Sequence, residues 1–207
     1  DEQSEIVLKN PGDRLYSPIT PTRDDGLIFY GWSASADSSE VLPYATTVTK
    51  ATEVYAVWGE GFEWNFDTDG DTENTTPDQI TGVTVQDGAL RGTTSGNDPK
   101  IFLRFIADFG HFNTVVVQGT ANSENEADGA WFQVYAALDK KPLAEERSVN
   151  KKFTYTDGLS ELRYSLYNDM RVASSYKNIT FFRLDPGSRS DINLCIERIF
   201  VIPDVPA

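Results

Sequence analysis

The chain has 207 residues, of which 39% are hydrophobic and 12% aromatic, so it can bury one large or two small cores. Thirty-two acidic residues against 18 basic ones give a formal net charge of −14. This charge repels phosphate backbones and anionic lipids, which argues against a nucleic-acid or membrane-surface partner and favours neutral partners.

Composition also limits the chemistry. A single Cys and a single His exclude a disulfide framework and a Cys or multi-His zinc site, and they argue against a nucleophile–histidine triad. No apolar run is long enough to span a bilayer. The chain starts without an initiator Met or a signal peptide, so we expect it to be part of a longer protein with flanking domains. We expect no enzyme activity.

Apolar residues alternate or run in short blocks, interrupted roughly every 8 to 12 residues by Gly, Asp-Gly or Pro. This pattern predicts an all-β protein. The only helix-like stretch, Pro142–Arg147, is so short that we expect a loop or a single turn. A Gly-Glu-Gly step at Gly59–Gly61 predicts a domain boundary, with one domain at 1–59 and another at 60–207.

In the first domain we expect strands at Ile6–Lys9, Leu27–Trp32 and Glu53–Trp58. Its motifs, in order, are GDRLYSPITPTR from Gly12, FYGW, TTVT and YAVW. They resemble the Listeria–Bacteroides repeat, also called the internalin B repeat, which implies a small β-grasp module of a bacterial surface protein. So small a domain needs its large side chains for burial, so we expect four aromatic residues in its core: Phe29, Trp32, Tyr55 and Trp58.

The second domain has nine candidate strands bounded by turn residues. They lie near 62–66, 89–93, 100–106, 113–119, 130–138, 150–156, 161–167, 178–184 and 192–202. Many short antiparallel strands in one domain predict a two-sheet β-sandwich of the jelly-roll kind.

Four segments of this domain resemble known proteins: FEWNFDTDGDTE at 62–73, VQDGAL at 85–90, FFRLDPG at 181–187 and CIERIFV at 195–201. They are similar to the jelly-roll, carbohydrate-binding-module-like domains of bacterial surface or glycan-active proteins. The resemblance implies a β-sandwich, a polysaccharide or other glycan as partner, and an extracellular or cell-surface location.

One strand shows which face would bind such a ligand. In Trp131–Leu138 every second residue from Phe132 is apolar and should face the core, which leaves a mixed aromatic and amide set outside. Aromatic rings stack on sugar C–H faces, while planar polar groups hydrogen-bond hydroxyls. The same parity adds three arginines if their strands share the sheet. The predicted ligand set is Trp131, Gln133, Tyr135, Arg104, Arg163 and Arg183.

Two alternatives stay open at this face. The aromatic residues could plug a sheet edge while the arginines pair with the abundant carboxylates. A second candidate patch lies in the polar loop at one end of the sandwich, where loops often bind ligands. It contains Tyr167, Asp169 and Tyr176.

Acidic residues after the first strand of this domain suggest a cation site. Asp67, Asp69, Asp71, Glu73 and Asp78 have the 1, 3, 5, 7, 12 spacing of an EF-hand loop, but Thr72 occupies the position of its glycine. A structural Ca²⁺ held by Asp67, Asp69 and Asp71, with Glu63 or Glu197 from a neighbouring strand, is one interpretation. A solvated acidic turn is the other.

The sequence therefore favours a non-catalytic carbohydrate-binding region of a bacterial extracellular or cell-surface protein, with the small module as a spacer. The alternative is a structural or adhesive stalk with no sugar ligand. A glycoside hydrolase is the third hypothesis, although no two of the 32 acidic residues are singled out by spacing as a catalytic pair.

The calcium interpretation predicts a stability effect. Carboxylates that folding brings together repel one another unless a cation neutralises them, so a chelator should lower the melting temperature. The loss should be smaller in the Asp67→Asn, Asp71→Asn double variant, as measured by differential scanning calorimetry. Identical melting curves in chelator and in excess calcium would refute the calcium interpretation.

Overall fold

The computed structural model describes residues 6–16, 21–43, 46–108, 111–122, 131–152, 160–169 and 176–203. The chain divides into two compact units between Gly59 and Glu60. Its elements are β1 (Ile28–Ser33), β2 (Tyr55–Gly59), β3 (Phe62–Trp64), β4 (Thr76–Asp78), β5 (Ile80–Gln86), β6 (Ala89–Thr94), β7 (Lys100–Asp108), β8 (Thr114–Asn122), β9 (Trp131–Leu138), the 3₁₀ turn η1 (Glu145–Arg147), β10 (Ser148–Lys152), β11 (Ser160–Ser165), the single-turn helix α1 (Leu166–Asp169), β12 (Asn178–Pro186) and β13 (Asn193–Ile202). The all-β prediction is confirmed. In the part of the chain described, no helix has the length and apolar character needed to cross a membrane.

The first unit is built on an antiparallel pair, β1 and β2, with an isolated bridge between Arg14 and Thr47. Phe29 is 2% exposed, and its ring centroid lies 5.0 Å from that of Trp32 and 5.4 Å from that of Trp58. The predicted aromatic core is confirmed at Phe29. The other three members are intermediate in burial: Trp32, Tyr55 and Trp58.

The strand predicted at Ile6–Lys9 is wrong. These residues have no strand conformation, and Ile6 and Leu8 are exposed. A strand forms where a neighbour accepts its backbone hydrogen bonds, and no described segment pairs with this one. The β-grasp fold of this unit stays a prediction.

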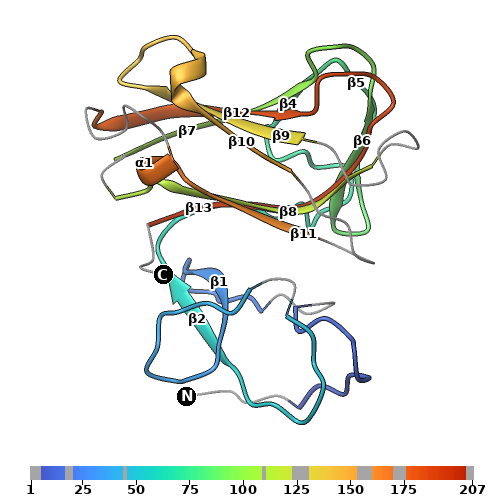
Figure 1. Ribbon diagram of the computed structural model, residues 1–207, viewed down its shortest axis with the longest axis vertical. Helices are drawn as coiled ribbons and strands as arrows, with labels where there is room; N and C mark the ends of the chain where they lie inside the picture. The colour runs from blue at the N-terminus through green and yellow to red at the C-terminus, as the bar shows by residue number, and fades with distance from the viewer. Residues whose placement is uncertain are drawn as a thin grey trace. The chain divides into compact units, whose positions relative to one another are not determined.

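The second unit is a sandwich of two antiparallel sheets, as predicted. One sheet has the order β10-β9-β12-β7-β4, and the other has the order β11-β8-β13-β6-β5 with β3 paired to β13. Figure 1 shows the two layers, with β12, β9 and β10 in one and β8, β13 and β11 in the other. From β10 onward the chain alternates between the sheets, as jelly-roll connections do.

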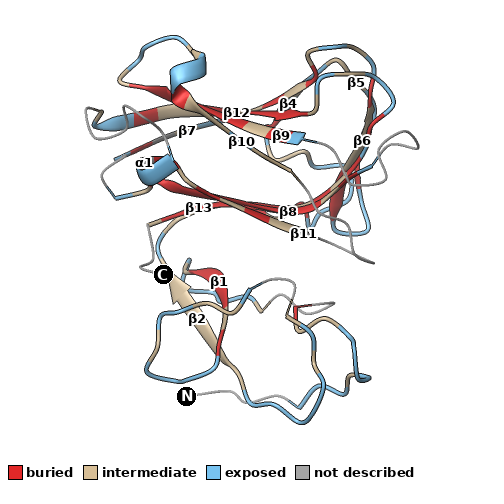
Figure 2. Cartoon of the chain, viewed as in Figure 1, coloured by how far each residue is buried: buried red, intermediate tan, exposed pale blue. Residues whose placement is uncertain are grey.

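Strand alternation fills the space between the sheets. In β9 every second side chain from Phe132 to Leu138 is fully buried, and in β12 Phe182 and Leu184 are fully buried. These residues belong to a single hydrophobic cluster drawn from both sheets. Figure 2 shows the buried stretches along the central strands. The core face predicted for β9 is therefore confirmed.

A fully buried hydrogen bond joins the two sheets across the core. The hydroxyl of Tyr164, on β11, donates to the backbone oxygen of Phe132, on β9, at 2.7 Å, and neither residue is exposed to solvent. Burial strongly raises the pKa of Tyr164, so the phenol stays a neutral donor. This bond ties the two sheets at the strand that carries the candidate ligand face.

The structure has two strands that the sequence analysis missed, β4 and β5. Pro77 interrupts the first, which is tolerated because β4 lies at a sheet edge where a missing N–H donor is not needed. Gly82, with φ of 63°, sits in an irregularity between Thr81 and Thr84 that breaks the period-two pattern of the second.

The strand expected at 161–167 ends at Ser165 and continues as α1. The stretch Pro142–Arg147 contains only η1, as predicted.

Phe132→Ala should lower the free energy of unfolding by about 3–5 kcal/mol, because it leaves a cavity in the shared core. Chemical denaturation measures the change. Trp131→Ala is the matched control, since this neighbour points away from the core and is half exposed. If the control unfolds the domain and Phe132→Ala does not, the assignment of the two faces of β9 is inverted.

Candidate functional site

A cavity of about 630 Å³ opens on the outer face of the five-stranded sheet. Its floor comes from β9, β10 and β12, and its rim comes from the loops at 97–98, 143–145 and 187–188. The residues that line it are Asn97, Asp98, Trp131, Gln133, Tyr135, Leu143, Ala144, Glu145, Asn150, Arg183, Asp185, Gly187 and Ser188. Its size is typical of ligand pockets.

Trp131 supplies the open aromatic surface of this cavity. It is the first residue of β9 and is 52% exposed, whereas its neighbour Phe132 is fully buried on the opposite face. Most tryptophan side chains in folded proteins are largely buried, whereas this indole stays in contact with solvent. Its ring is therefore available to a ligand.

Tyr135 takes a different role from Trp131 although both lie on the same side of β9. It is 8% exposed, and the guanidinium of Arg183 lies 4.9 Å from its ring centroid, so its face is covered. Its hydroxyl donates to Glu145 at 2.5 Å. Burial, together with the bond to Glu145, raises the pKa of Tyr135 well above its ordinary value, so the hydroxyl stays protonated.

Gln133 lies between these two residues in sequence and is fixed by its amide. Its Nε2 donates to Glu145 at 3.1 Å and to the Ser148 hydroxyl at 2.8 Å. The Ser148 hydroxyl in turn donates to the backbone oxygen of Glu145 at 2.9 Å. The turn η1 is thereby tied to β9, and the Gln133 carbonyl oxygen keeps a fixed orientation.

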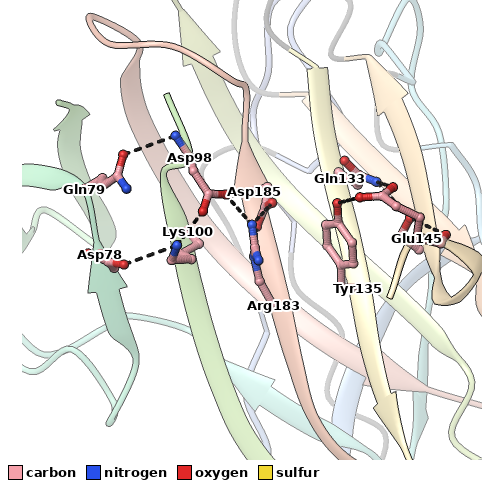
Figure 3. A network of polar contacts seen from close by, with 10 residues as sticks. Asp78, Gln79, Asp98, Lys100, Gln133, Tyr135, Glu145, Arg183 and Asp185 are labelled. Atoms are coloured by element: carbon pink, nitrogen blue, oxygen red, sulfur yellow. Dashed lines mark hydrogen bonds and ion pairs between the residues drawn. The ribbon is translucent and has the colours of Figure 1, made fainter. Parts of the chain in front are cut away.

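Arg183 is the centre of a second polar network (Figure 3). Its Nε and Nη2 donate to the two carboxylate oxygens of Asp185, each at 2.6 Å, and Nη2 also donates to Asp98. Bidentate pairs of this kind fix both groups in one plane. Burial raises the pKa of Asp185, and the pairing with Arg183 opposes that rise.

Asp98 links this network to the β6–β7 loop. Its carboxylate accepts from Lys100 Nζ at 2.6 Å, and its backbone N–H donates to Gln79 Oε1 at 3.2 Å. Gly96 makes room for that amide, since a side chain there would collide with Gln79. The hydrogen bond from Lys100 and the charge of Arg183 hold the pKa of Asp98 below its ordinary value.

Of the predicted ligand set, the structure brings Trp131, Gln133, Tyr135 and Arg183 together in the cavity. Arg104 lies exposed on β7 of the same sheet but does not line the cavity. The prediction that Arg163 belongs to this ligand set is wrong, because β11 lies in the other sheet. There the Arg163 Nε lies 3.7 Å from Glu161 Oε1.

The second candidate patch is only partly described. The side chain of Tyr167 lies outside the described residues. Asp169 ends α1 and pairs with Lys151 at 3.1 Å. The Tyr176 ring lies beneath two cations, with Lys141 Nζ 5.0 Å and the Arg147 guanidinium 5.8 Å from its centroid. The contacts of Asp169 and Tyr176 are with neighbouring strands and loops of the fold.

Four acidic residues of the β3–β4 loop accept hydrogen bonds from backbone N–H or hydroxyl groups of the protein. Glu73 accepts from the N–H of Phe66 at 2.7 Å, which supports a left-handed backbone at that buried residue, with φ of 51°. Asp71 accepts from the N–H of Glu73, Asp69 from the N–H of Asp87, and Asp67 from the Thr68 hydroxyl.

Glu197, the fourth predicted metal ligand, lies half-buried on β13, where burial raises its pKa and Arg91 lowers it. Over the described ranges, no three His, Cys, Asp or Glu side chains are grouped closely enough to hold a metal ion. The structure therefore does not bring Asp67, Asp69, Asp71 and Glu197 together as one set. Calcium binding stays a prediction.

Three acidic residues of the cavity were not predicted from the sequence: Asp98, Glu145 and Asp185. One of them carried a signal, since Asp185 follows Arg183 by two residues and so shares its face of β12. Asp98 and Glu145 come from a loop and a turn. Only the folded chain brings these two residues to the sheet.

The chain matches no protein-family model and no curated protein. Among solved structures it is similar to a low-affinity xylan-binding module, CBM86, from Roseburia intestinalis, at 6% identity and a TM-score of 0.45, over 70% of this chain and 97% of that one. It is also similar to the family 29 carbohydrate-binding module CBM29_1 from Piromyces equi, at 12% identity and a TM-score of 0.47, over 70% and 92% of the two chains.

Lys100→Met should raise the pKa of Asp98 towards its ordinary value of 3.8, because it removes the ammonium that lowers it. Since folding lowers this pKa, the pair stabilises the fold above the ordinary pKa and stops doing so as the pH falls through the folded-state value. NMR titration of the Asp98 carboxyl carbon measures the shift. Lys50→Met, at an exposed position in the other unit, should leave it unchanged. An unaltered Asp98 titration in Lys100→Met would contradict the contact.

Proposed function

We propose that the second domain, residues 60–207, is a non-catalytic carbohydrate-binding module that binds a glycan in the cavity on the five-stranded sheet. One observation carries this proposal: a half-exposed tryptophan, Trp131, lines a cavity whose wall also includes a set of hydrogen-bonded polar side chains. An aromatic ring offers stacking to the C–H face of a pyranose, and oriented polar groups offer hydrogen bonds to its hydroxyls.

Preorganisation supports the proposal. Glu145, on η1, accepts hydrogen bonds from Gln133 and from Tyr135, both on β9. Arg183 donates to both Asp185 and Asp98. Groups that are already ordered lose little conformational entropy when a ligand arrives. A sugar can therefore bind without reordering this wall.

The same contacts favour binding over hydrolysis. A glycoside hydrolase needs one carboxyl group that donates a proton and a second that acts as base or nucleophile across the scissile bond. In the cavity Asp98 and Asp185 are both bonded to one guanidinium, so they lie on the same side. The third carboxyl group, that of Glu145, accepts hydrogen bonds from Tyr135 and Gln133, so it already serves as an acceptor within the cavity wall.

For the whole chain we propose a bacterial extracellular or cell-surface protein. The first unit would then be a Listeria–Bacteroides-type β-grasp module that acts as a spacer. This part of the proposal rests on the sequence motifs around Gly12, Phe29 and Tyr55. Further domains on either side of the chain belong to the same proposal.

Trp131→Ala should remove most glycan retention while leaving the fold intact. Loss of the stacking ring should cost about 1–3 kcal/mol of binding free energy. The stability change should stay within about 0.5 kcal/mol, since the side chain is half exposed. Affinity electrophoresis against plant, mucin and microbial polysaccharides measures the first, and chemical denaturation the second.

Trp131→Phe is the control, because it keeps an aromatic face and should retain part of the binding. Retention by no polysaccharide would refute the carbohydrate-binding proposal and favour a structural stalk. Equal retention by the native protein and by Trp131→Ala would place any glycan site elsewhere.

A further inference from the structure

The charges that line the cavity are unbalanced. Three carboxylates face it, from Asp98, Glu145 and Asp185, against one cation, Arg183. The nearby Lys100 does not line the cavity and is engaged by Asp98 and by Asp78, at 2.6 and 3.3 Å. The cavity wall is therefore negatively charged.

Arg183 also offers a ligand anion no free pair of parallel N–H groups. A guanidinium binds a carboxylate or sulfate best through two parallel N–H groups. In this structure the Nε and Nη2 edge already holds both oxygens of Asp185, and Nη2 holds Asp98 as well. A ligand carboxylate could bind two parallel N–H groups of Arg183 only by displacing Asp185 or Asp98.

The carboxylates, in contrast, keep capacity for donors. Each ionised carboxylate offers about four lone-pair directions. Asp185 uses two of them on Arg183, and Asp98 uses one on Arg183 and one on Lys100. The remaining lone pairs accept hydrogen bonds, which sugar hydroxyls donate and which acidic substituents cannot.

Resting on the proposed function, we propose that the cavity selects neutral glycans and rejects acidic ones that carry uronate or sulfate groups. Trp131 recognises the ring face, which acidic and neutral sugars share. The acceptor-rich wall of Asp98, Asp185 and Glu145 then distinguishes them, because an anion placed against it meets like charge in a partly desolvated site.

The test compares polymers in pairs on the full chain. Methyl-esterified polygalacturonate is set against polygalacturonate, and hydroxyethyl cellulose against carboxymethyl cellulose, so that each pair shares one backbone and differs in charge. Affinity electrophoresis and isothermal titration calorimetry at low ionic strength measure the binding. We expect the neutral polymer of a bound pair to bind at least about tenfold more tightly, with the gap narrowing as salt screens the charges. Equal or tighter binding of the acidic polymer overturns the inference while leaving the proposed function standing. If the native protein binds neither polymer of either pair, and none of the polysaccharides used in the Trp131→Ala experiment, the proposed function is refuted and this inference with it.

Two variants locate the selectivity. Asp185→Asn removes one carboxylate and frees the edge of Arg183, so binding of the acidic polymer should increase and that of the neutral polymer should fall. Glu145→Gln removes a second charge at an exposed position, where unfolding is not expected, and should also narrow the preference. Asp37→Asn, exposed in the first unit, makes the same change in net charge and should leave the preference unchanged. If Glu145→Gln and folded Asp185→Asn both keep the native protein's preference for neutral polymers, the assignment of selectivity to this wall is overturned. The same holds if Asp37→Asn changes that preference as much as they do.

Discussion

Burial of one face of each sheet against the other is the constraint on which the rest of this structure depends. Period-two alternation means that every apolar residue fixed inside fixes the direction of its neighbours outside. Because Phe132 and Phe182 are locked in the core, Trp131, Gln133 and Arg183 must lie on the opposite face. The candidate site is thus a by-product of core packing in β9 and β12.

Electrostatics then decides what that outer face can do. A half-buried arginine beside a buried aspartate is costly unless each satisfies the other, and Arg183 and Asp185 do so along two parallel bonds. Together with the bond from Arg183 to Asp98, that mutual satisfaction leaves the cation no free pair of parallel N–H groups for a ligand anion. It leaves the ring of Trp131 and the unused oxygen lone pairs as the chemically open parts of the cavity.

The sequence was informative where a single strand carries the pattern. The parity of β9 predicted both its core face and the outward Trp131, and it would have predicted Asp185 had it been applied along β12. It failed where sheet membership mattered, since nothing local distinguishes the strand of Arg163 from that of Arg104. Glu145 reaches the cavity through a turn, and Asp98 through a loop. Such placements depend on long-range packing, which residue spacing does not encode.

The four tryptophans of the chain differ in their access to water. Trp64 is 7% exposed, Trp32 and Trp58 are intermediate, and Trp131 is 52% exposed. An indole in water emits at longer wavelength than one in an apolar core, and it collides more often with a dissolved quencher such as acrylamide. The long-wavelength, quenchable part of the emission therefore belongs mainly to Trp131. The protein carries a built-in optical reporter at the wall of its own cavity.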